Sequence, residues 1–316
     1  MLNLLKSDLY RIVRRVDFWV FSALCALMMV AVAGMMAYFA SPEFSMMVHE
    51  NLANQADLTV EERAEAQAEL DEARQDVAEV ELLNGKEMHS VTTMWANTYL
   101  NGGFLGIVTA IFVALFLARD FKSGFIKNLN MSRAGRVRYY AEKLVIVALL
   151  DAFFLALCSI FSVAAFTVFG FTFQVAESAG AVALWLFLAW LAMFAYSCLV
   201  ACVVWLSRSE AVSIAFAVIV CSCVVGAFLV QLSLLLANAF PVFESLQYWT
   251  IVGGISMLTQ GADALFAQEG AAVISALYPW GEALIVPWWQ ILLADALYVI
   301  IACVLVFAVC RKRNVA

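Results

Sequence analysis

The sequence predicts an all-α membrane protein with six transmembrane helices and both termini in the cytoplasm. Three observations predict it: an apolar composition, six long apolar runs, and an uneven distribution of basic residues. Of the 316 residues, 65% are hydrophobic and 14% are charged, and the mean hydropathy is +0.91. This is more apolar surface than a soluble fold buries in one core, so lipid must surround much of the chain.

Six apolar runs are long enough to cross a bilayer, since about 20 helical residues span roughly 30 Å of hydrocarbon. Each run lacks Lys and Arg in its interior. Lipid offers no hydrogen bonds to the backbone, so runs of this length must be helices. The six expected spans are residues 18–40, 99–118, 144–170, 181–206, 211–236 and 288–310.

The basic residues predict the orientation of these spans. Fifteen of the 18 Lys and Arg residues fall before the first span, between spans two and three, between spans four and five, or after the sixth. The positive-inside rule makes that side cytoplasmic, which leaves a short cytoplasmic tail at 311–316. The first 17 residues place Leu5, Leu9 and Ile12 at helical spacing among basic residues. We therefore expect residues 1–17 to form a helix in the cytoplasmic interface.

Two segments are expected on the extracytoplasmic side. Residues 41–98 form a predicted helical insertion between spans one and two, with a capping box at Thr59 and Glu62. The insertion is acidic, and its role stays open between a solvated face and a site for cationic peptides. Residues 237–287 hold short apolar runs interrupted by Gly and Pro, which favours re-entrant or interfacial helices.

Asp151 and Asp295 are the carboxylates inside expected spans. An ionised carboxylate in hydrocarbon costs several kcal/mol, so both should face protein or water. A proton relay would need the two groups to cooperate, but they are expected near opposite ends of the bilayer. Helix packing or an interfacial role is therefore the favoured interpretation.

Catalytic signatures are absent from the sequence. No G-x-x-x-x-G-K-[ST] loop is present to bind ATP, and neither H-E-x-x-H nor G-x-S-x-G occurs. Cys198 and Cys202 lie one helical turn apart, but no further ligand stands near them, which favours apolar packing. We expect no catalytic, cofactor-binding or metal-ligating residues, and therefore a chain that is not an enzyme.

The segment 119–143 carries seven basic residues between spans two and three. Phe121, Phe125, Ile126 and Leu129 recur at helical spacing, followed by the turn "NMSRAG" and a second helix that leads into span three. A short amphipathic helix on a basic platform is typical of a docking element in the cytosol. The alternative is simple anchoring with contact to anionic lipid.

Three features carry a resemblance to a known family. They are the opening "LLKSDLYRIVRRVDFWV", the segment "DFKSGFIKNLNMSRAGRVRYYAEKL", and the order of six spans with both ends inside. Together they resemble the type-2 ABC exporter permeases, especially bacterial permeases of the antibiotic-resistance and lantibiotic-immunity kind. In that family the second segment is the coupling helix contacted by a separate ATPase. Asp120, Gly124, Arg133 and Lys143 match its acidic residue, glycine, basic turn and Lys-led third span.

The resemblance implies a multi-pass protein of the bacterial cytoplasmic membrane. Its partners would be a separate ABC ATPase, which binds ATP and Mg, and a second permease copy or paralogue; no nucleic acid is expected. The cargo would be amphipathic: a peptide antibiotic, a lipid or a drug. The sequence departs from the family in having Asp120 where Glu is common, Phe125 where Thr is common, and a longer first outer loop. The expected docking residues are Asp120, Phe121, Lys122, Gly124, Phe125, Ile126, Lys127 and Arg133.

Two other functions remain open. A proton-coupled secondary transporter would depend on Asp151 or Asp295 and need no ATPase. A non-transporting sensor or assembly subunit would use the acidic outer insertion to bind a ligand and the basic segment to bind a signalling partner.

Overall fold

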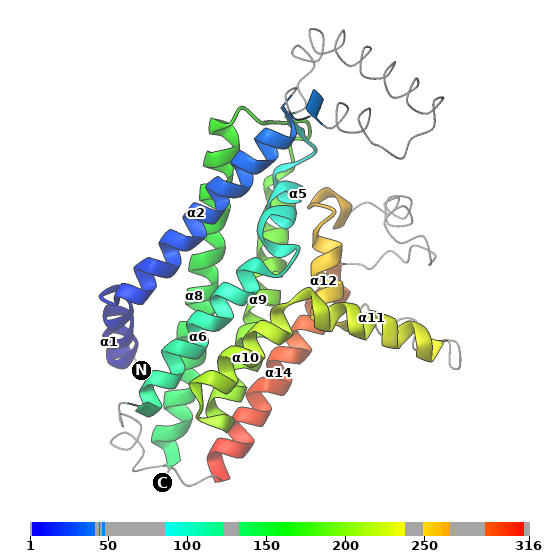
Figure 1. The fold of residues 1–316 in the computed structure, drawn as a ribbon. Coiled ribbons are helices and arrows are strands. Elements are labelled where there is room, and N and C mark those ends of the chain that lie inside the picture. The colour runs from blue at the N-terminus through cyan, green and yellow to red at the C-terminus, as the bar shows by residue number, and fades with distance from the viewer. Residues whose placement is uncertain are drawn as a thin grey trace, which may run out of the picture.

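The computed structural model describes residues 2–41, 44, 46–47, 86–122, 133–237, 249–265 and 288–312. Helices dominate this part of the chain (Figure 1). In chain order the elements are α1 (Leu2–Val13), α2 (Val16–Phe39), β1 (Glu87–Met88), α5 (Val91–Trp95), the π-helix η1 (Ala96–Leu100), α6 (Phe104–Lys122), α8 (Arg133–Val168), β2 (Thr172–Phe173), α9 (Ala179–Ser207), α10 (Glu210–Cys221), α11 (Cys223–Ala237), α12 (Ile251–Leu258), the 3-10 helix η3 (Asp263–Leu265) and α14 (Trp288–Lys312).

Helix α9 lies at the centre of the bundle. It packs against α6, α8, α10 and α14, and α2 packs against α8 at the periphery. Within its most apolar stretch 72% of α9 is buried, against 22% for α2 and 28% for α14. The outer helices therefore present apolar side chains outward, as a helix facing lipid does.

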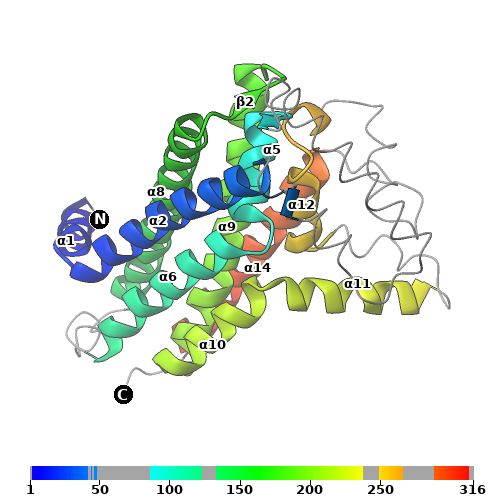
Figure 2. The same ribbon diagram turned by 45° about the horizontal axis from the view of Figure 1, so that its top comes forward.

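Among the described residues, five helices are long and apolar enough to cross a membrane: α2, α6, α8, α9 and α14. A sixth crossing requires α10 and α11 to form one span, and the two are bent by 60° relative to each other. The expected continuous span over 211–236 is therefore interrupted in the structure. Figure 2 shows α11 leaving the bundle sideways at this break.

Close backbone packing explains the break without a proline. Gly103 has a φ of +73°, and a Cβ built on it would stand 2.0 Å from the carbonyl oxygen of Cys221. At the next residue the backbone turns extended, and the Ser222 hydroxyl donates to the carbonyl oxygen of Ile219. The "NGG" stretch before α6 thus lets its backbone lie against the end of α10, which a side chain would prevent.

The structure has two ends with different chemistry (Figure 1). We call the end where α1, the C-terminal ends of α6 and α14 and the N-terminal end of α8 lie the basic end, because Lys and Arg gather on these segments. The opposite, far end carries α5, α12 and the short parallel pair of β1 and β2. Helix α8 begins at Arg133 and runs for 36 residues, so it starts about three turns before the expected span at 144.

A carboxylate holds the far end together. Glu177 accepts hydrogen bonds from the backbone N–H of Thr92 and of Ala262, each at 3.0 Å, and from the Thr92 hydroxyl. The Trp185 indole donates to the Leu258 carbonyl oxygen at 2.9 Å. These bonds connect α5, the segment before α9, and the turn after α12.

Several expectations fall on residues outside the described ranges. The capping box at Thr59 and most of the insertion at 41–98 lie there, as does the apolar run "GAAVISALYPW" at 270–280. Within the expected segment 237–287, the described residues 251–258 form the short helix α12, which packs against α9 and α14.

Candidate functional site

Five side chains from three helices meet inside the basic end. We call this group the ionic cluster: Asp8 and Arg11 from α1, Asp120 from α6, and Tyr139 and Lys143 from α8. Local periodicity pairs them on each helix. Asp8 and Arg11 lie three residues apart, and Tyr139 and Lys143 lie four apart, so each pair shares one helix face.

Lys143 is the centre of the ionic cluster. Its Nζ lies 2.6 Å from Asp8 Oδ2 and 2.7 Å from Asp120 Oδ2. The Lys143 side chain is 1% exposed and both aspartate side chains are 2% exposed. Water therefore screens these ion pairs far less than it screens pairs at the surface.

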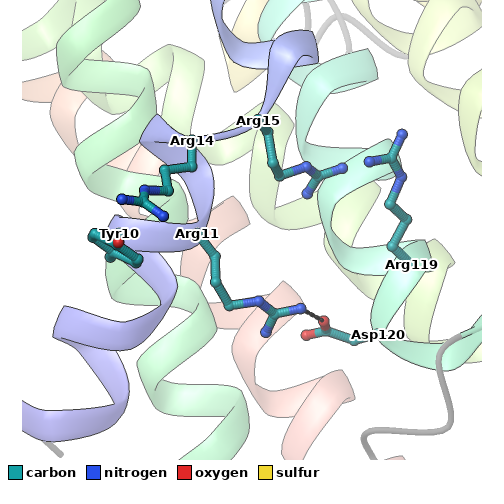
Figure 3. A pocket seen from close by; sticks show the side chains of 6 residues that line it. All are labelled: Tyr10, Arg11, Arg14, Arg15, Arg119 and Asp120. Carbon is teal, nitrogen blue, oxygen red and sulfur yellow. Dashed lines mark ion pairs between the residues drawn. The ribbon is translucent and has the colours of Figure 1, made fainter.

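Aromatic and polar groups complete the shell around Lys143. The Tyr139 hydroxyl donates to Asp120 Oδ2 at 2.8 Å. The Lys143 ammonium lies 4.6 Å from the centre of the Phe116 ring, a cation–π distance. Arg11 reaches Asp8 Oδ1 at 3.1 Å and Asp120 Oδ1 at 3.8 Å, and Figure 3 shows this guanidinium directed at Asp120.

The ionic cluster joins the helices on both sides of the segment expected to dock a partner. It contains two cations and two carboxylates, so its formal charges balance. Removing one member of a buried pair leaves an uncompensated charge, which typically costs about 3–5 kcal/mol. The ionic cluster therefore links the end of α6 to α8 and α1.

Beside the ionic cluster lies a cavity of about 350 Å³. Its lining combines four arginines with one tyrosine and one carboxylate, drawn from α1, the α1–α2 junction and α6 (Figure 3). We call it the arginine pocket: Tyr10, Arg11, Arg14, Arg15, Arg119 and Asp120.

The structure places the expected docking residues in three different situations. Asp120 is buried in the ionic cluster, where its carboxylate pairs with Lys143 and accepts a hydrogen bond from Tyr139. Phe121 is partly buried and packs on the core. Lys122 and Arg133 end α6 and begin α8, and their side chains lie outside the described part. Gly124, Phe125, Ile126 and Lys127 also lie outside it.

The carboxylates of the expected spans lie in separate surroundings. Asp151, in α8, is buried and accepts a hydrogen bond from the Ser197 hydroxyl of α9 at 2.9 Å. Asp295, in α14, is fully buried, and within the described residues neither of its oxygens has a hydrogen-bond partner. Both carboxylates, which were expected to face protein or water, are thus buried within the bundle.

An apolar cavity of about 680 Å³ lies along α8 and α9. Trp190 borders it and donates its indole N–H to the Ala148 carbonyl oxygen at 2.9 Å, which holds the ring in place. Trp95 borders it from α5. Its apolar lining suits hydrocarbon chains or the apolar part of an amphipathic molecule.

Sequence reasoning missed the cluster roles of Asp8, Arg11 and Tyr139. A signal was present: an acidic residue on the apolar face of an otherwise basic amphipathic helix is costly unless it is paired. Lys143 entered only through the resemblance, and nothing local indicated that Asp8, 135 residues earlier, would contact it.

The comparisons agree with this architecture. Residues 77–224 match the family model described as ABC-2 family transporter protein, a region that runs from β1 across α6, α8 and α9 into α11. None of the curated proteins matches the chain. Permeases of this family are membrane transport subunits, generally without catalytic activity, and they normally work with a separate ATPase subunit. With its apolar helices and this match, which covers just under half of its length, the chain is a multi-pass cell-membrane protein with an ABC-2 family transporter domain, consistent with a type-2 ABC permease.

Proposed function

We propose that this chain is the permease subunit of an ABC exporter, and that a separate ATPase drives it through the segment 119–143. ATP and Mg bind to the ATPase, and the permease works with a second copy or a paralogue. In this assignment the basic end faces the cytoplasm, as the positive-inside rule favours.

The ionic cluster is the observation that carries the proposal. It lies directly on both sides of residues 123–132, with Asp120 on the helix that enters this segment and Lys143 on the helix that leaves it. A push on the segment reaches both helices through one buried network. Because the network has neutral formal charge and little exposure, it keeps its geometry while the helices move as a unit.

The cargo proposed is an amphipathic molecule such as a peptide antibiotic, a lipid or a drug. The apolar cavity along α8 and α9 supports this class, since its lining offers little to a hydrophilic solute. In the described spans, the buried carboxylates Asp151 and Asp295 are few against the apolar surface around them.

Docking is tested at Phe125, which the resemblance places on the face of the coupling helix. Phe125→Asp should abolish co-purification with the ATPase and ATP-dependent transport, because a carboxylate would be buried in an apolar contact. Phe125→Leu keeps an apolar side chain and serves as the matched control. Equal transport and equal ATPase recovery in the Asp variant and the Leu variant would refute docking at this residue.

The proton-coupled alternative rests on the buried carboxylates Asp151 and Asp295. Vesicles that contain the chain alone distinguish it from the exporter. Transport driven by a proton gradient, without nucleotide or ATPase, would replace the proposal by a secondary carrier.

A further inference from the structure

The arginine pocket contains more positive charge than its own carboxylates balance. Arg15 Nη2 and Arg119 Nη2 lie 3.1 Å and 2.7 Å from the same oxygen of Asp17. One carboxylate is thus shared by two guanidinium groups. Arg14 adds a further cation, stacked 4.5 Å from the centre of the Tyr10 ring.

The wider neighbourhood has the same excess. Among the described residues, the pocket arginines and their direct ion-pair partners comprise five cations, with Lys143 included, against the carboxylates of Asp8, Asp17 and Asp120. The ionic cluster uses two of these carboxylates to balance Lys143 and Arg11. Near neutral pH the remaining three guanidiniums face one carboxylate.

Arg15 shows the strain of this arrangement. Its Nε is buried without a hydrogen-bond partner among the described residues. Burial, followed by the nearby charge of Arg119, lowers the pKa of Arg15 below its ordinary value. Guanidinium groups remain charged in proteins, so an anion in the pocket would relieve the repulsion and satisfy free N–H donors.

Exposed apolar and aromatic side chains lie close to the pocket in the chain, at the start of the apolar helix α2. Val16 and Trp19 at the start of α2 are 74% and 58% exposed, and Tyr10 on α1 is 58% exposed. The Trp19 indole donates to the Val13 carbonyl oxygen at 2.8 Å, which holds the ring beside the α1–α2 turn. Exposed aromatic side chains beside arginines are typical of the headgroup layer.

We propose that the arginine pocket is a binding site for a phosphate group, presented by the headgroup of an anionic phospholipid or by free phosphate. Phosphate matches the planar fork of a guanidinium, which binds two of its oxygens at once. Bound there, the anion connects α1 and the α1–α2 junction to the end of α6 at Arg119, next to the ionic cluster. The site is independent of the cargo and of the ATPase.

Arg14→Gln is the main test variant. Arg14 is exposed and contacts the Tyr10 ring, whereas Arg11, Arg15 and Arg119 form ion pairs, so we expect its replacement to disturb the pocket least. Arg14→Lys keeps the charge but removes the fork. Arg138→Gln is the control: it removes the same charge from an exposed position on α8 outside the pocket lining. Circular dichroism confirms that each variant is folded.

The full chain is placed in nanodiscs of phosphatidylcholine, alone or mixed with phosphatidylglycerol. Native mass spectrometry then counts the phosphatidylglycerol retained per chain. A second arm adds inorganic phosphate to the phosphatidylcholine discs and records the thermal midpoint. In the arm that shows binding, we expect Arg14→Gln to weaken it roughly fivefold to tenfold. Arg14→Lys should weaken binding less, and Arg138→Gln should leave it unchanged.

The two arms identify the source of the phosphate. Retained phosphatidylglycerol without a response to inorganic phosphate identifies a lipid headgroup, and the reverse identifies free phosphate. Binding in neither arm would overturn the proposal. So would equal losses in Arg14→Gln and Arg138→Gln, because diffuse attraction of anions to a basic surface would then account for the effect.

Discussion

Lys143→Met removes the centre of the ionic cluster while it keeps most of the side-chain volume. Asp8 and Asp120, both 2% exposed, would then share Arg11 as their ion-pair partner among the described residues. One buried carboxylate loses its counter-charge, and the usual cost of that loss is about 3–5 kcal/mol. For a chain of this size the cost corresponds to a fall in Tm of roughly 6–10 °C.

A thermal-shift measurement in detergent or nanodiscs tests this value, with Lys6→Met on the exposed face of α1 as the matched control. The double variant Lys143→Met with Asp120→Asn removes one charge of each sign and leaves Asp8 with Arg11. It should recover a large part of the lost stability, because the remaining pair is neutral. A Tm in Lys143→Met equal to that of Lys6→Met, or no recovery in the double variant, would refute the reasoning.

Three further predictions concern the rest of the molecule. Gly103→Ala should lower Tm well beyond Gly102→Ala. Alanine at either position adopts a positive φ, with a strain of about 1–3 kcal/mol, but only alanine at 103 meets a neighbouring backbone oxygen. Equal losses of Tm in the two variants would exclude the clash. Glu177→Ala should destabilise the fold by about 2–4 kcal/mol and lower Tm accordingly, because it leaves the N–H donors of Thr92 and Ala262 unsatisfied. Glu177→Gln, which still accepts hydrogen bonds, should lower Tm less. An unchanged Tm in the Ala variant would show that these bonds do not stabilise the fold. Asp151→Asn and Asp295→Asn should retain ATP-dependent transport, measured in vesicles with the ATPase, and loss of transport in both folded variants would favour proton coupling.

Apolar helices dominate the structure because hydropathy and helix length are local properties. A run such as residues 18–40 is too apolar to be exposed to water, and in lipid its backbone N–H and C=O groups must hydrogen-bond to one another. It therefore forms a helix whatever its tertiary contacts are. The helix α1 could also be predicted from the sequence, because Leu5, Leu9 and Ile12 repeat at helical spacing. Five of the six expected spans coincide with long apolar helices of the described residues, and the expected span over 211–236 is the one that the structure interrupts.

That difference shows where local information ends. Residues 211–236 are apolar throughout, and no proline or charge marks Ser222 as a break. The break follows from a backbone contact with Gly103, more than one hundred residues earlier in the chain. A hydropathy average over neighbouring residues cannot detect a contact with a residue so distant in the sequence.

By itself, the sequence determined that this protein belongs in a membrane, that it crosses mainly as helices, and that its basic residues collect at one end. Only the tertiary structure decided that Asp120 forms a buried ion pair with Lys143, and that arginines from three segments surround one cavity. The physical reason is the difference between effects that depend on one residue and effects that need two residues to be in contact. Transfer into lipid acts on each residue separately, whereas an ion pair acts only after folding has brought Asp8, Asp120 and Lys143 within 3 Å.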